Sequence, residues 1–159
     1  MLTQERLKEL FNYNPETGLF TRILNVANVH AGDVAGWIRD NGYIDISVDN
    51  KKWRAHILAW FFTYGEIPKL DIDHINGNRI DNRISNLRLA NRSQNNENRK
   101  CAQSNNKTGL MGVCAKRKKW RATIVINGKQ TNLGVFDTQE DAHQAYLNAK
   151  RKHHTFCTI

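Results

Sequence analysis

The spacing of apolar positions over the first hundred residues predicts a small mixed fold. Helical spacing, period-two alternation and turn residues predict, in order, a capped helix, a β-meander, a buried helix, two short strands and a further helix. Their ranges are 3–11, about 19–55, 55–64, 69–74, 86–89 and 93–99. Residues 14–18 are predicted to form a turn, because Pro15 fixes one backbone angle and Gly18 ends the bend.

The last fifty residues have a clearer pattern. Three strand-like runs are followed by a helical run that begins at Thr138. Asn127-Gly128 between the second and third runs is a strong hairpin signal. Alternation in the middle run places its apolar residues on one face, and alanines at helical spacing after Thr138 let the helix pack closely there. The three runs are 112–115, 120–126 and 129–136.

Together these elements predict an α+β chain of two domains. Residues 1–98 form the first domain, with its core at about 53–98, and residues 108–159 form a three-stranded antiparallel sheet packed on one helix. Between them, residues 99–107 are rich in asparagine, lysine and serine and poor in large apolar groups, which indicates a linker.

Charge changes the picture of the second domain. The chain has 24 Lys and Arg against 15 Asp and Glu, a formal net charge of +9. Residues 100–159 hold 11 basic and three acidic side chains, whereas residues 1–99 are nearly neutral. An excess of this kind favours a polyanionic partner, and nucleic acid is the first candidate.

Composition also excludes several classes. The longest apolar run, residues 57–62, is too short to cross a bilayer, and the first residues have no apolar signal-peptide core. Three cysteines without a C-x-x-C pair support neither a disulfide framework nor a cysteine zinc site. We therefore expect a cytoplasmic protein with free thiols and no membrane contact.

The candidate chemistry lies in the first domain. Asp73 and His74 stand at a strand end, Asn86 follows twelve residues after His74, and Asn95 nine residues later. Carboxylate and amide oxygens suit a hard cation such as Mg²⁺, and a histidine can take a proton from water near neutral pH. These residue types allow metal-assisted phosphodiester hydrolysis, but an Asp-His pair alone is more often structural.

The full motif resembles the HNH endonucleases of the small phage and homing type. It includes Asp73-His74, the run 82–88 and Ser93-Gln94-Asn95, and the similarity extends upstream to Arg54, His56 and Trp60. The resemblance covers roughly residues 40–99 and implies a ββα-metal core. The last motif position is Asn instead of His, as in the homing branch.

The resemblance also implies roles. His74 becomes the general base, Asp73 and Asn95 become ligands of Mg²⁺ or Mn²⁺, and Asn86 holds the loop and orients His74. Strict alternation sends Asp73 and His74 to opposite faces, so both reach one site only if the strand ends or bends there. We expect His56 to be a packed histidine and Asn82 to stabilise the loop between the motif strands.

The C-terminal segment resembles the Apetala/ethylene-response-factor type of DNA-binding domain, through its glycines, Trp120 and the alanine-rich helix. In that family the sheet lies in the major groove with the helix behind it. We expect Trp120 to be a core residue. The residues predicted to contact bases or sugars are Arg121, Thr123, Gln130 and Asn132, and those predicted to grip the backbone are Lys116, Arg117, Lys118 and Lys119. Arg88 and Arg92 are predicted to reach phosphates beside the catalytic site.

The sequence therefore predicts a monomeric, phage-encoded HNH endonuclease that acts on double-stranded DNA in a bacterial host cell. One alternative is a sequence-specific DNA-binding regulator whose HNH region is not catalytic. An RNA-binding module is less favoured, because the outward positions of the predicted sheet are mostly polar and not aromatic.

Overall fold

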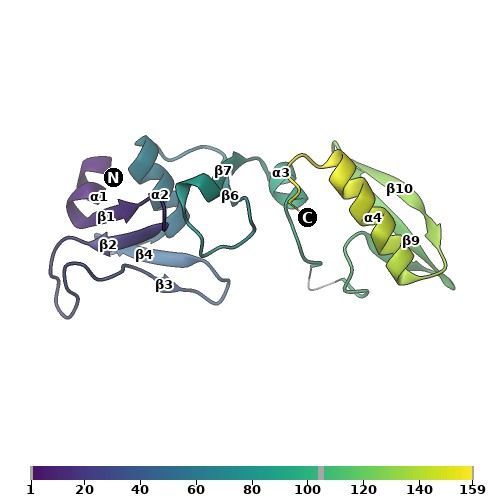
Figure 1. The fold of residues 1–159 in the computed structure, drawn as a ribbon, viewed down its shortest axis with the longest axis horizontal. Helices are drawn as coiled ribbons and strands as arrows, with labels where there is room; N and C mark the ends of the chain where they lie inside the picture. The colour runs from purple at the N-terminus through teal and green to yellow at the C-terminus, as the bar shows by residue number, and fades with distance from the viewer. Residues whose placement is uncertain (1, 104–105, 159) are drawn as a thin grey trace. The chain divides into compact units, whose positions relative to one another are not determined.

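The chain divides into two units, residues 1–90 and 91–159, and the computed structural model describes residues 2–103 and 106–158. Figure 1 labels the main elements along the chain. The elements of the first unit are α1 Gln4–Leu10, β1 Phe11–Asn14, β2 Leu19–Arg22, β3 Trp37–Ile38, β4 Ile44–Val48, β5 Lys51–Arg54, α2 Ala55–Tyr64, β6 Asp71–His74, the 3-10 turn η1 Ile84–Asn86 and β7 Leu87–Ala90. Those of the second unit are α3 Arg92–Glu97, β8 Val113–Lys116, β9 Lys119–Ile126, β10 Lys129–Phe136 and α4 Gln139–His153.

The first unit begins with a capped helix and a hairpin. The side chain of Thr3 accepts a hydrogen bond from the Arg6 amide at the start of α1. β1 pairs with β2 around a turn in which the Asn14 side chain accepts from the Glu16 and Thr17 amides. The predicted meander is therefore divided: β1 and β2 form a separate hairpin, and the meander is β3–β4–β5.

The helix predicted over residues 55–64 is confirmed as α2, which ends at Gly65 in the left-handed conformation. Its buried residues Ala55, Leu58, Ala59 and Phe61 join one core cluster with side chains from α1, β1, β2, β4 and β7. Burial of this apolar surface is the main source of stability for the unit. His56 lies on the same helix and is also buried.

After α2 the chain forms a two-stranded antiparallel ribbon, β6–β7. Asp73 pairs with Arg88, and His74, the last residue of β6, pairs with Leu87. The connecting loop turns at once, because the Gly77 amide donates to the His74 carbonyl. Both motif strands are thus confirmed, with β6 beginning two residues later than predicted.

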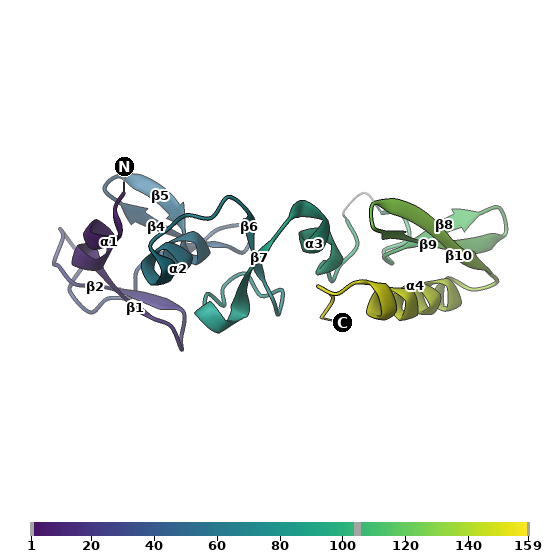
Figure 2. The same cartoon turned by 90° about the horizontal axis from the view of Figure 1, so that it is seen from above.

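In the second unit, β8, β9 and β10 form an antiparallel sheet in the order β10–β9–β8, and α4 covers one face of it (Figure 2). Ala122 and Val113 of the sheet and Ala142 of α4 are buried together, with Trp120 packed against them. The turn at Asn127-Gly128 has positive φ at both residues, as the type I′ hairpin requires. The predicted sheet, its helix and the core position of Trp120 are confirmed.

The second unit begins at residue 91, so α3 is described with it. The predicted end of the first domain at residue 98 stays a prediction. The side chain of Thr158 donates to Asn98 just after α3, and the ammonium group of the buried Lys150 on α4 donates to the Arg99 carbonyl. These bonds tie the start of the predicted linker to the C-terminal module. Residues 104 and 105 of that linker lie outside the described residues.

In the part of the chain that the structure describes, we find no helix with the length and apolar character needed to span a membrane.

Candidate active site

His74 lies in an aromatic setting inside the first unit. Its side chain is only 4% exposed, and its ring centroid is 5.1 Å from that of His56 and 6.0 Å from that of Tyr43. Burial lowers the pKa of His74 below its ordinary value, against the opposing effects of the Asn82 hydrogen bond and the nearby Asp73 and Asp81 carboxylates. The imidazole is therefore favoured in its neutral form.

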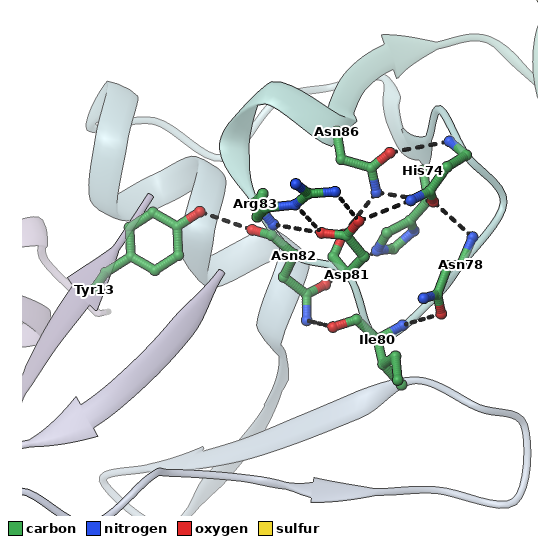
Figure 3. Close-up of polar contacts among 9 residues, drawn as sticks. Tyr13, His74, Asn78, Ile80, Asp81, Asn82, Arg83 and Asn86 are labelled. Atoms are coloured by element: carbon green, nitrogen blue, oxygen red, sulfur yellow. Dashed lines mark hydrogen bonds and ion pairs between the residues drawn. The ribbon is translucent and has the colours of Figure 1, made fainter. Parts of the chain in front are cut away.

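Asn82 fixes the tautomer of that imidazole. Its Oδ1 lies 3.0 Å from Nε2 of His74, and its Nδ2 donates to the Ile80 carbonyl (Figure 3). The carbonyl can only accept, so the amide nitrogen must face Ile80 and the oxygen must face the ring. Nε2 of His74 then carries the proton, and Nδ1 is the nitrogen with the lone pair. Asn82 was expected only to stabilise the loop, and its contact with the histidine was not predicted.

The loop that carries Asn82 is held by the N-terminal hairpin. Tyr13 on β1 donates its hydroxyl to the Asn82 carbonyl at 2.7 Å (Figure 3). Burial raises the pKa of Tyr13 to about 12, so the hydroxyl keeps the proton it donates. Gly18, in the β1–β2 turn, has a positive φ, and a Cβ atom there would lie 2.4 Å from the Arg83 nitrogen. The hairpin thus packs directly on the backbone that positions Asn82.

Asn86 holds the other side of the same loop. It is buried, its Oδ1 accepts from the Asn76 amide, and its Nδ2 donates to the Asp81 carbonyl. The Asn86 carbonyl accepts from the Ile75 amide, directly after His74. Asn86 therefore has the loop-holding position predicted for the central asparagine, while the ring contact itself comes from Asn82. Its predicted influence on the orientation of His74 stays a prediction.

Asp73 faces Arg88 across the ribbon. Arg88 donates to the same carboxylate oxygen, Oδ2, through Nε and Nη2, each at 3.0 Å. Strand alternation places the side chains of Asp73 and His74 on opposite faces of β6. β6 ends at His74, the position where both could reach one site only if the strand ended or bent. The carboxylate is still near enough to raise the pKa of His74. Arg88 was predicted to contact DNA, and here its charge is partnered by Asp73.

Asn95, the second predicted metal ligand, lies half-buried on α3 in the second unit. Its helix begins with a capping box formed by Asn91 and Gln94. Arg92, a predicted phosphate contact, is exposed on the same helix. Among residues 2–103 and 106–158, no three His, Cys, Asp or Glu side chains gather where they could hold a metal ion. The ligand roles of Asp73 and Asn95 stay predictions.

The predicted DNA-contacting residues of the second unit share the open face of the sheet or its edge turn. Thr123 pairs with Asn132 and Val125 with Gln130, so these residues and Arg121 lie on the face opposite the buried Ala122 and Ile124. Thr123 is half-buried and the rest are exposed. The four basic residues of the β8–β9 turn, Lys116, Arg117, Lys118 and Lys119, are also exposed. Lys119 forms an exposed ion pair with Asp137.

His56 is packed beside His74, as expected. Burial, together with the neighbouring His74 and Arg54 and against the effect of Asp45, lowers the pKa of His56 to about 3. Between the unfolded value of about 6.5 and this value, the unfolded chain binds a proton that the folded chain does not. The free energy of unfolding therefore falls as the pH falls through that window, by up to about 1.4 kcal/mol per pH unit from this group.

We expect His56→Gln to show a shallower loss of stability than the parent between neutral pH and about pH 5. Urea unfolding of both proteins at the two pH values measures this difference. Equal pH slopes in the two proteins would contradict the assignment of a neutral, buried His56.

Comparisons with known proteins point to one family. A family model described as HNH endonuclease matches residues 54–97, which include His74 and all three of its predicted partners. Protein 3.8 of Escherichia phage T7 is 38% identical over 106 residues, 65% of this chain and 87% of that protein. The uncharacterized HNH endonuclease L560 of Acanthamoeba polyphaga mimivirus is 32% identical over 112 residues, 69% of this chain and 57% of that protein. No solved structure matches the chain at a significant level.

Proposed function

Since this chain belongs to the HNH endonuclease family, we propose that it hydrolyses DNA phosphodiester bonds with His74 as the general base. The observation that carries this proposal is the buried imidazole of His74, whose Nε2 lies 3.0 Å from Oδ1 of Asn82. In a neutral imidazole with its proton on Nε2, Nδ1 is the atom that would take a proton from water.

The proposed reaction is a direct hydrolysis. A water molecule loses a proton to Nδ1 of His74 as its oxygen attacks the phosphorus, and the bond to the leaving sugar oxygen breaks. Solvent supplies the proton that the leaving oxygen needs. In this scheme Asn82 keeps the histidine in one tautomer, and the Tyr13 and Gly18 contacts keep Asn82 in place.

HNH nucleases use a divalent metal ion, which stabilises negative charge on the phosphate oxygens when it is bound. The side chains predicted to hold it carry suitable donor atoms. Asp73 offers a carboxylate and Asn95 an amide oxygen, the hard donors that Mg²⁺ or Mn²⁺ prefers. Arg88 donates to Oδ2 of Asp73 through Nε and Nη2, so the arginine can orient this carboxylate.

The second unit supplies duplex binding in this proposal. Its support is the positive charge of residues 100–159 and a sheet face that presents Arg121, Thr123, Gln130 and Asn132 away from α4. A sheet of this kind can place polar side chains against base edges while lysines contact phosphates.

Neutralising Lys116 and Lys118 together tests this surface. If each contacts one phosphate, Lys116→Gln/Lys118→Gln should lower the slope of log affinity against log salt by about two. Fluorescence anisotropy of a labelled duplex in EDTA measures the slope. Lys51→Gln/Lys52→Gln, at two exposed positions at the start of β5 in the first unit, is the matched control. An unchanged slope in the first variant would place the binding surface elsewhere.

Plasmid cleavage tests the function itself. The purified chain is incubated with supercoiled plasmid in Mg²⁺ or in EDTA, and its DNA binding is measured in the same preparation. We expect conversion of the plasmid only with Mg²⁺. Binding without conversion in Mg²⁺ or Mn²⁺ would support the non-catalytic regulator instead.

A further inference from the structure

Two arginines, Arg79 and Arg54, lie close to the Tyr43 ring beside the candidate active site. The guanidinium carbon of Arg79 lies 4.9 Å from the centre of the Tyr43 ring, and that of Arg54 lies 5.1 Å from it. The same ring is 6.0 Å from the ring of His74. Two cations are therefore held one aromatic ring away from the proposed base.

The positions of these arginines are fixed by polar contacts. The buried Asp45 accepts from Arg54 at 3.0 Å and from Arg39 at 3.1 Å. Arg79 donates to the Asn41 carbonyl at 2.7 Å, on the turn that leads into β4. Such contacts reduce the side-chain entropy that a flexible arginine would lose on binding a ligand.

The charges in this group are not balanced. The guanidinium groups of Arg39, Arg54 and Arg79 stand against the carboxylate of Asp45, so this group keeps a net positive charge. Arg83 and Arg88 differ, because each has a carboxylate partner of its own, Asp81 and Asp73, whereas Arg39 and Arg54 share the single carboxylate of Asp45. No ion pair involving Arg79 is found among residues 2–103 and 106–158, and its side chain is exposed.

We infer that Arg79 and Arg54, arranged over Tyr43, bind a phosphate of the DNA strand next to the one that is cut. This inference rests on the proposed endonuclease function and assigns the first unit its own DNA contact. A guanidinium that lies over an aromatic ring uses its face for that contact and keeps its edge N–H groups for hydrogen bonds. Those edge groups match the oxygens of a phosphate. The first unit, although nearly neutral overall, thus has its own phosphate contact, which holds the DNA strand beside His74.

Arg79 is the residue to change, because Arg54 also satisfies the buried Asp45 and its loss would disturb folding. We expect Arg79→Gln in the full chain to weaken duplex binding in EDTA and to lower the salt slope by about one. Arg79→Lys keeps a cation that can contact phosphate, so it should restore the slope. Arg6→Gln, an exposed arginine on α1 that pairs with Asp49 and Glu9, is the control and should leave both quantities unchanged.

Two results would overturn the inference: an Arg79→Gln slope equal to that of the parent, with or without a loss of affinity, or a failure of Arg79→Lys to restore the slope. Because this measurement is made in EDTA, it does not depend on cleavage. A parent protein that fails to cut plasmid while Arg79→Gln lowers the slope would refute the endonuclease proposal and leave the phosphate site standing.

Discussion

His74→Ala is expected to abolish metal-dependent DNA cleavage while leaving DNA binding close to that of the parent. General-base catalysis by a positioned side chain contributes about a hundred- to ten-thousandfold to a rate, and alanine cannot accept the proton. Binding should persist, because the proposed DNA contacts are made by other residues. Plasmid conversion in Mg²⁺ and duplex anisotropy in EDTA separate the two properties.

The control for this variant must account for folding. Removing the imidazole leaves the buried Oδ1 of Asn82 without its His74 partner, which costs about 1–3 kcal/mol of stability. Thermal unfolding should therefore accompany the cleavage assay. His30→Ala, an exposed histidine in the same unit, should keep full activity. A folded His74→Ala protein that cuts like His30→Ala would remove His74 from the mechanism.

Asn82→Leu should have the second largest effect, a loss of about ten- to a hundredfold in cleavage rate. Leucine fills a similar volume but offers no acceptor to Nε2, so the imidazole loses the contact that selects its tautomer and orientation. Single-turnover cleavage at saturating protein measures the rate without interference from binding.

Asn82→Asp and Asn78→Ala make this prediction specific. Aspartate keeps an acceptor for His74, so it should retain more activity than leucine. Its negative charge should also raise the pKa of His74 and shift the acidic limb of the pH profile upward. Asn78 is an exposed asparagine of the same loop and serves as the control. Parental activity in Asn82→Leu would show that the contact is incidental.

The local pattern of the sequence was sufficient for much of the fold. Residues 55–64 are apolar on several sides and form α2 over that range, and Asn127-Gly128 forms the expected hairpin turn. These predictions succeed because the determining interactions lie within one helix or one turn. The Asp73-His74 pair at the end of a strand was found in the same way, from neighbouring residues.

Contacts between distant residues could not be predicted in this way. Asn82 is one of many asparagines in its region, and no local signal separates the one that contacts His74 from those that cap turns. Tyr13 is 69 positions from Asn82, and Gly18 meets the Arg83 nitrogen across a similar separation. Only the packing of the β1–β2 hairpin on the loop brings these residues together.

The contacts of residues 98 and 99 are a second case in which residues far apart in the sequence meet. The composition of residues 99–107 resembles a linker, but the Lys150 ammonium bonds the Arg99 carbonyl and Thr158 bonds Asn98. A lysine at the end of a basic helix is ordinarily exposed, so its burial could not be expected from sequence. These bonds join the residues directly after α3 to the C-terminal end of the second unit.

The most direct measurement of His74 as the base is chemical rescue. His74→Gly leaves space beside the rings of His56 and Tyr43, where added imidazole can replace the lost side chain. We predict that this variant is inactive in Mg²⁺ alone and regains cleavage as imidazole is added, in proportion to the unprotonated imidazole. A His74→Gly protein that cleaves DNA at the parental rate without imidazole would contradict the account.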